Sequence, residues 1–153
     1  MDPLEQLIGK GFEYGARGPD AFDCYGLAME VYRLAGLPEL PDQEEFAEAA
    51  GRGLPDFENI PGGSPESIAE INSTAFSATH ACFLPLDKPA PYAIVTLRSI
   101  NGFVSHLGVV LPNLRQFIHV FPKRNVVIDR LDHPLWSQKI EGFYRYAPPP
   151  KTL

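Results

Sequence analysis

The chain has 153 residues, a mass of 16.9 kDa and a formal net charge of -6, which fits one domain with a core of its own. Its 44% of apolar residues excludes a disordered chain, and its acidic balance argues against nucleic-acid binding, which needs clustered Lys and Arg. No apolar run approaches the ~18 residues of a membrane span, so no membrane partner is expected.

The N-terminal residues predict a short helical turn followed by a loop. Leu4, Leu7 and Ile8 share one face of such a turn. The first five residues have neither a basic start nor an apolar stretch, so we expect no secretory signal. Glycine and proline recur through residues 12–23, which favours a loop there.

An amphipathic helix is predicted over Cys24–Ala35. Asp20 or Asp23 is suited to cap its first turn, and Gly36 is suited to end it. The residues that share its apolar face at helical spacing are Leu27, Val31 and Leu34.

The middle of the chain carries weaker signals. Gln43–Ala50 and Pro65–Phe76 each have a composition that allows a helix. Between them, Gly51–Gly63 is rich in glycine and proline and predicts a loop, and long loops in compact domains are often functional.

The last third predicts an antiparallel sheet. Short runs rich in β-branched and apolar residues alternate with turn signals such as Asn-Gly and Pro-Asn. Helices followed by such a sheet predict an α+β domain. The expected strands are residues 92–98, 105–111, 115–120, 125–129 and 142–146.

Cys24 is a candidate nucleophile because it begins the predicted helix. Unpaired N–H groups at a helix N-terminus favour a thiolate, the reactive form of cysteine. A buried and inert cysteine is the alternative interpretation.

His106 and His119 are candidates for the base that a cysteine nucleophile requires. They lie on successive predicted strands, and a hairpin would bring both imidazoles to one end of the sheet. One ring could accept the thiol proton while the other held it in the correct tautomer. For either histidine alone, an ordinary structural role is the alternative.

Other clusters indicate no second kind of site. His80 and Cys82 supply only two potential metal ligands, so no metal is expected. The carboxylates in residues 42–48 suit a solvated helix face, and nothing in their spacing selects a glycosidase pair. No phosphate-binding loop is present, and no cofactor is expected.

Several segments together resemble the NlpC-type cell-wall cysteine peptidases. They cover about half of the chain in the order of that family, with a cysteine block followed by two histidine strands. The segments are Tyr14–Gly18, Phe22–Leu27, Val31–Tyr32, Gly36–Pro38, Ser105–Leu111, Phe117–Val120, Trp136 and Gly142–Arg145.

The resemblance implies a minimal papain-like α+β domain, with an N-terminal catalytic helix packed on a C-terminal antiparallel sheet. This domain would span residues 1–147, with an insert at about 40–90, and a proline-rich tail would follow at 148–153. The implied reaction is hydrolysis of a peptidoglycan stem peptide, for example between γ-D-glutamate and a diamino acid, without metal or cofactor. The implied catalytic residues are Cys24, His106 and His119, and the implied substrate-binding residues are Tyr14, Asp23 and Ser105.

Tyr25 departs from the serine that commonly follows the cysteine in the family. The variant Asp-Cys-Tyr-Gly-Leu is most similar to members associated with the tails of phages and prophages. That resemblance implies a protein made in the cytoplasm, incorporated in a virion with other phage tail proteins, and acting at the cell wall. Two alternatives stay open: a structural tail-tip or assembly protein with little or no activity, and acyl chemistry on a different substrate.

Overall fold

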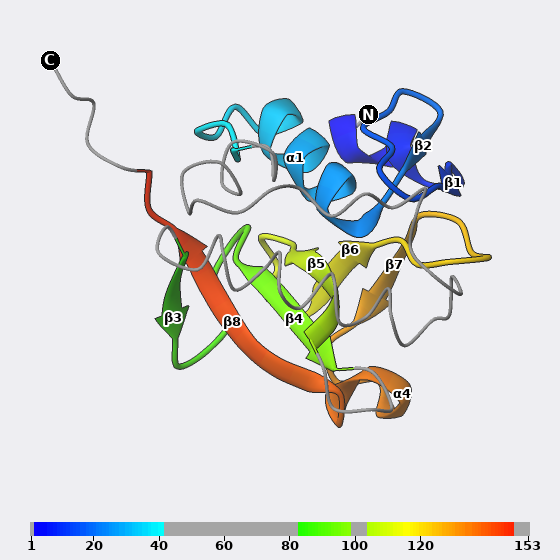
Figure 1. Cartoon of the computed structure of the whole chain (residues 1–153). Helices are drawn as coiled ribbons and strands as arrows, with labels where there is room; N and C mark the ends of the chain where they lie inside the picture. Colours follow the sequence, from blue (N-terminus) through cyan, green and yellow to red (C-terminus); the bar gives the residue numbers. More distant parts are fainter. Residues whose placement is uncertain (1, 42–82, 99–103, 149–153) are drawn as a thin grey trace, which may run out of the picture.

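The computed structural model describes residues 2–41, 83–98 and 104–148 of the chain (Figure 1). The two helices and the loop predicted within residues 43–76 lie outside the described residues, as do His80, Cys82 and the carboxylates of residues 42–48. Within the described residues, no helix has the length and apolarity needed to cross a membrane.

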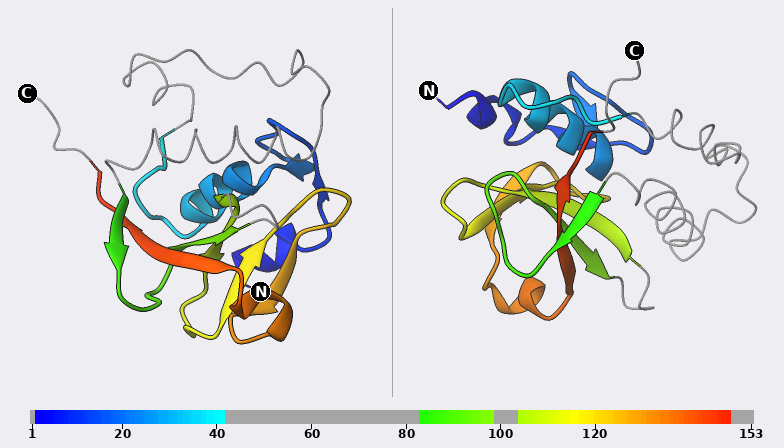
Figure 2. Two further views of the ribbon diagram at one scale, coloured as in Figure 1. Left: turned by 60° about the horizontal axis from the view of Figure 1, so that its bottom comes forward. Right: turned by 90° about the vertical axis from the view of Figure 1, so that its left-hand side faces the viewer.

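The described residues form a helical layer on one face of an antiparallel sheet, which confirms the predicted α+β class (Figure 2). The six strands of this sheet run in the order β3-β8-β4-β5-β6-β7. The elements are η1 (Pro3–Leu7), β1 (Gly11–Phe12), β2 (Ala21–Phe22), α1 (Cys24–Leu34), β3 (Phe83–Leu86), β4 (Ile94–Arg98), β5 (Val104–Val110), β6 (Gln116–His119), β7 (Val127–Arg130), α4 (Pro134–Ser137) and β8 (Ile140–Tyr146).

Helix α1 begins and ends where its capping signals are. Asp23 is the N-cap, and its side chain accepts a hydrogen bond from the backbone N–H of Gly26. At the other end Gly36 has a φ of 71°, which glycine adopts without strain. Gly36 and Leu37 donate backbone hydrogen bonds to Arg33 and Tyr32, which satisfies carbonyls of the last turn. The predicted helix is therefore confirmed to within one residue.

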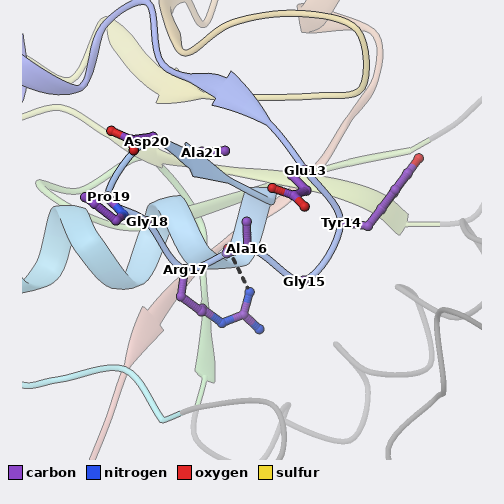
Figure 3. A pocket seen from close by; sticks show the side chains of 9 residues that line it. All are labelled: Glu13, Tyr14, Gly15, Ala16, Arg17, Gly18, Pro19, Asp20 and Ala21. Carbon is purple, nitrogen blue, oxygen red and sulfur yellow. Dashed lines mark hydrogen bonds between the residues drawn. The ribbon is translucent and has the colours of Figure 1, made fainter.

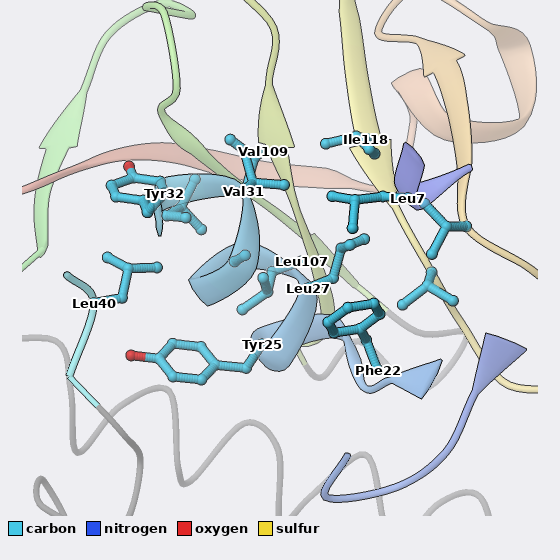
Figure 4. Packing of buried hydrophobic residues seen from close by; sticks show 14 of the residues in the cluster. Leu7, Phe22, Tyr25, Leu27, Val31, Tyr32, Leu40, Leu107, Val109 and Ile118 are labelled. Carbon is cyan, nitrogen blue, oxygen red and sulfur yellow. The ribbon is translucent and has the colours of Figure 1, made fainter. Parts of the chain in front are cut away.

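The core is divided by the sheet into two clusters. The larger cluster lies between α1 and the sheet (Figure 4), where Leu27 and Val31 of the helix meet Leu107, Val109 and Ile118 of strands β5 and β6. The smaller cluster lies on the opposite face of the sheet and contains residues from β4 to β6 together with α4. Its buried members are Ala93, Val95, Leu97, Val110, Phe117, Leu131 and Trp136.

The N-terminal residues differ in part from the sequence-based prediction. Leu4 and Leu7 are buried as expected, but Ile8 is 47% exposed because η1 ends at Leu7 and the chain turns away. The region predicted as a loop, residues 12–23, contains β2 and the second residue of β1, which form a parallel pair of two residues each. Strands this short carry no periodicity, so their pairing depends on contacts between distant residues.

Strands β4 to β8 start or end within two residues of the predicted runs, whereas β3 was not predicted. Strand β3 contains Pro85, and among the described strands it pairs with β8 alone, at one edge of the sheet. Strand β7 forms the opposite edge. The β4–β5 pair lies at the centre of the sheet, with one strand between it and each edge strand.

Candidate active site

Cys24 is the first residue of α1 and is a free, half-buried thiol. The cap at Asp23 fixes the start of the helix at this residue. The backbone N–H groups of Tyr25 and Leu107 both stabilise negative charge on the sulfur. Because Leu107 directly follows His106, the thiol lies beside the strand that carries this histidine.

The environment of Cys24 favours the neutral thiol. Burial raises the pKa of Cys24 to about 12, and the adjacent Asp23 carboxylate adds to this rise. The Leu107 and Tyr25 N–H groups and the Arg17 guanidinium oppose the rise, but they do not overcome it. The thiolate expected from the helix N-terminus is thus not the resting form, because burial outweighs the helix-end effect.

His106 and His119 are brought together by the β5–β6 pairing. His106 Nε2 and His119 Nδ1 are 2.8 Å apart, a hydrogen-bond distance. Gly108 makes room for this pair, since a Cβ there would stand 2.8 Å from the Phe117 ring and 3.0 Å from the His119 Cβ. The hydrogen-bonded pair that the sequence suggested is therefore present in the fold.

Two further residues extend this chain of polar groups, and sequence reasoning missed both roles. The other nitrogen of His119, Nε2, is 2.7 Å from Asp129 Oδ2, and Trp136 Nε1 donates to the same oxygen at 3.1 Å. Asp129 lies in the expected strand at residues 125–129, but only the β6–β7 register, which pairs it with Phe117, shows that it lies diagonally across from His119. In the sequence, Trp136 stood out only as one of the segments that resemble the NlpC-type family.

Both imidazoles are held neutral by their surroundings. Burial and the neighbouring His119 lower the pKa of His106 well below 6.5. Burial also lowers the pKa of His119, although the Asp129 carboxylate partly counteracts it. His119 is fully buried in an aromatic enclosure, with ring centroids 4.3 Å from Phe117 and 4.8 Å from Trp136. At neutral pH each imidazole ring is therefore uncharged, with a proton on one of its two nitrogens.

Tyr14 lies in the loop in front of Cys24. Its side chain is 41% exposed, and partial burial and the nearby Cys24 both raise the pKa of Tyr14. This loop borders a pocket of about 410 Å³ lined by residues 13–21 (Figure 3), in which Tyr14 and Arg17 project away from the backbone. The predicted substrate-binding residue Tyr14 thus lies beside the candidate nucleophile.

The Asp23 carboxylate is occupied by hydrogen bonds to neighbouring residues of the same loop and helix. Its carboxylate accepts hydrogen bonds from Gly26 N at 2.6 Å, Gly15 N at 3.1 Å and Arg17 Nη1 at 2.8 Å. These contacts hold the pocket loop against the helix start, and substrate binding by Asp23 stays a prediction. Ser105 lies in β5 next to His106, and its predicted role in substrate binding also stays a prediction.

In the part of the chain that the structure describes, no three His, Cys, Asp or Glu side chains gather in a way that could hold a metal ion. His106, His119 and Asp129 instead form a linear series of hydrogen bonds, in which each histidine nitrogen at a junction already faces a partner. The arrangement suits one histidine that exchanges a proton while the groups behind it hold its tautomer.

A helix that begins at a cysteine and packs on an antiparallel sheet, whose strands carry two hydrogen-bonded histidines, matches the papain-like α+β fold of the NlpC/P60 structures. The chain belongs to the NlpC/P60 family, whose model matches residues 9–145. No curated protein matches the chain in sequence.

Solved structures of this family share the fold at low sequence identity. An NlpC/P60 family protein from Bacillus cereus has a TM-score of 0.59 at 17% identity, covering 96% of this chain and 40% of its own. A protein similar to an NLP/P60 family lipoprotein, from Staphylococcus aureus, has a TM-score of 0.56 at 17% identity, with 97% and 40% covered. NlpC1 from Trichomonas vaginalis has a TM-score of 0.51 at 19% identity, with 94% and 41% covered. The chain thus spans about two fifths of the length of these proteins.

Proposed function

We propose that the chain is a cysteine peptidase that cleaves an amide bond in a peptidoglycan stem peptide, such as the bond between γ-D-glutamate and a diamino acid. One observation carries this proposal. The Cys24 thiol lies at the start of α1 beside β5, whose His106 is hydrogen-bonded to His119, in a chain of the NlpC/P60 family.

The reaction begins from a neutral thiol and a neutral imidazole. Because a free Cys24 thiolate is disfavoured, the thiol proton moves to His106 as the sulfur attacks the scissile carbonyl carbon. The C–S bond forms, the C–N bond breaks, and the imidazolium returns its proton to the leaving amine. Water then hydrolyses the thioester, with His106 again acting as the base.

The helix start also serves the transition state. The backbone N–H of Cys24 is at the first position of α1, where N–H groups have no partner within the helix. This group is suited to donate a hydrogen bond to the oxyanion that forms during attack. The macrodipole of α1 acts in the same direction.

The pocket at residues 13–21 is the proposed site for the stem peptide. It adjoins Cys24 through Tyr14 and contains charged groups of both signs, among them Glu13 and Arg17. Such a site suits a substrate with carboxylates and a free amine. Tyr14, Asp23 and Ser105 are the proposed substrate-binding residues, with Asp23 acting in addition as the structural cap.

We also propose that the peptidase works as a component of a phage or prophage tail, made in the cytoplasm and assembled with other tail proteins. The Asp-Cys-Tyr-Gly-Leu segment supports this proposal by its resemblance to tail-associated members. In the fold, Tyr25 is buried and its hydroxyl donates to the carbonyl of Pro41, so it anchors the chain that leaves α1. Detection of the protein in purified virions by immunoblotting tests its location.

The activity is tested by incubating the protein with purified peptidoglycan and synthetic stem peptides and identifying the products by mass spectrometry. We expect Cys24→Ala and Cys24→Ser to abolish cleavage, and His106→Ala to lose nearly as much, because nucleophile and base act as a unit. His119→Ala should lose less, since an orienting group takes no proton from the thiol.

A wild type that is inactive on several wall chemistries, with normal tail assembly in a Cys24→Ala phage, would favour the structural alternative. Transfer products instead of hydrolysis products would favour other acyl chemistry. Cleavage retained by Cys24→Ala would exclude the cysteine mechanism altogether. Glu5→Ala, which removes an exposed carboxyl outside this pocket, is the control for nonspecific effects of substitution.

A further inference from the structure

The proton positions in the series His106–His119–Asp129 follow from the acceptor at its end. An ionised carboxylate only accepts hydrogen bonds, so His119 Nε2, 2.7 Å from Asp129 Oδ2, must carry the ring proton. A neutral His119 then has a lone pair on Nδ1. His106 Nε2, 2.8 Å from that lone pair, must be the donor. Both rings are therefore Nε2–H tautomers, and the free lone pair of His106 is on Nδ1.

Trp136 determines which atom of residue 129 faces the histidine. The indole N–H is a donor and never an acceptor, and it lies 3.1 Å from the same Oδ2 that faces His119. Two donors therefore converge on one oxygen. The Trp136 side chain is itself fixed, because it is buried in the smaller core cluster and α4 holds its backbone.

We propose that Asp129, oriented by Trp136, is a positioning residue that fixes the tautomers of His119 and His106 and so leaves His106 Nδ1 as the nitrogen that accepts the Cys24 proton. The inference rests on the proposed function for its catalytic meaning. The tautomers themselves are a property of the resting protein and can be measured without any substrate.

The charge of residue 129 and the orientation of its side chain can be tested separately. In Asp129→Asn the amide can place either its oxygen or its NH2 group toward His119. The Trp136 N–H and an NH2 group at that position would be two donors facing each other. The indole therefore selects the orientation in which the amide oxygen faces His119. We therefore expect Asp129→Asn to keep both tautomers. Only when Trp136→Phe is added does the amide become free to turn, and a second tautomer of each histidine should appear.

The test is long-range ¹H–¹⁵N NMR of the histidine rings, which separates Nδ1–H from Nε2–H tautomers. The wild type, Asp129→Asn and Trp136→Phe should each show Nε2–H at both histidines, and the double variant should show a mixture. Asp132→Asn is the matched control, because this exposed carboxylate is two residues beyond Arg130 and pairs with it. It should change neither ring.

Activity on a cleavable stem peptide gives the second readout. Asp129→Asn should lower kcat/KM about tenfold, the difference between a charged and a neutral acceptor for His119, whose Nδ1 in turn accepts from the His106 imidazolium. The double variant should lose substantially more, toward the ~10⁴-fold loss associated with a wrong tautomer. Asp132→Asn should retain the wild-type rate.

Each outcome bears on one claim. A wild-type spectrum with Nδ1–H at His119 would overturn the role of Asp129, and a tautomer mixture in Asp129→Asn alone would overturn the role of Trp136. The wild-type spectrum decides the first question even if the double variant does not fold. Expected tautomers in a protein without peptidase activity would refute the proposed function and leave the positioning assignment intact.

Discussion

The carboxylate of Asp23 is predicted to hold the nucleophile helix and the pocket loop together, and its removal should be costly. Asp23→Ala removes the N-cap bond to Gly26, at about 1 kcal/mol, and the bond to Gly15, at about 1 kcal/mol. It also removes the ion pair with Arg17, which is partly exposed and contributes at most about 1 kcal/mol. The free energy of unfolding should fall by about 3 kcal/mol in total.

Asp23→Asn provides a graded comparison at the same position. An amide oxygen in place of Oδ1 keeps the contacts to Gly26 and Arg17, whereas the NH2 group in place of Oδ2 faces the Gly15 N–H and loses that bond. We therefore expect a loss of about 1 kcal/mol from this variant.

Urea denaturation followed by circular dichroism measures these differences. For a domain of this size, the larger loss should also lower Tm by about 6–12 °C. Asp20→Ala removes an exposed carboxyl from the same loop and should change stability by less than about 0.5 kcal/mol. Equal losses in Asp23→Ala and Asp23→Asn, or an Asp23→Ala variant as stable as the wild type, would refute the assignment of these contacts.

Cys24, Gly26 and His106 each have an environment with a measurable consequence. Because the pKa of Cys24 is raised to about 12, its alkylation by iodoacetamide should be slow at pH 7, and the rate should still be rising at pH 10. Asp23→Asn should accelerate the alkylation. Mass spectrometry measures the rate, and a rate that levels off by pH 8 would contradict this prediction. Gly26→Ala should lower the free energy of unfolding by about 1–3 kcal/mol despite the better helix propensity of alanine, since the new Cβ would stand 2.3 Å from the Ala16 carbonyl oxygen. If urea denaturation shows no loss, the loop that contains Ala16 moves aside without cost. Because the pKa of His106 is lowered in the folded protein, the unfolded chain binds more protons below pH ~6.5. The free energy of unfolding should therefore fall as the pH drops from about 6.5 toward the lower pKa of the folded state. His106→Gln should reduce this dependence of the denaturation midpoint on pH, and an unchanged dependence would assign it to other groups.

The parts of the fold that sequence predicted well are those with local signals. The helix at Cys24–Leu34 has apolar spacing, an N-cap and a C-terminal glycine, and all three are used in the structure. The strands from β4 onward have β-branched runs separated by turns. The parallel β1–β2 pair has no such signal, because it is closed by contacts such as Gly11 N to Asp20 O. Strand β3 was obscured by Pro85, which is uncommon within a sheet.

The candidate site shows the same division between local and distant information. His106 and His119 could be associated from their strands, since a hairpin of those runs can bring both imidazoles to the same end of the sheet. Asp129 could not, because its alignment depends on the register of Phe117 opposite Asp129 in the β6–β7 hairpin. The raised pKa of Cys24 could not be predicted either. Helix position is visible in sequence, but the burial that outweighs it is a property of the packed fold.

The two edge strands affect how copies of the protein meet. An open sheet edge is a template for adding another strand, and soluble proteins block it with proline, charge or short strands. Here β3 has only four residues, and its Pro85 supplies no N–H, so it cannot donate a regular ladder of hydrogen bonds. At the opposite edge, β7 carries Asp129 and the exposed Arg130, whose guanidinium pairs with Asp132. Edge-to-edge association is thus disfavoured at both ends of the sheet, even where many copies are crowded together.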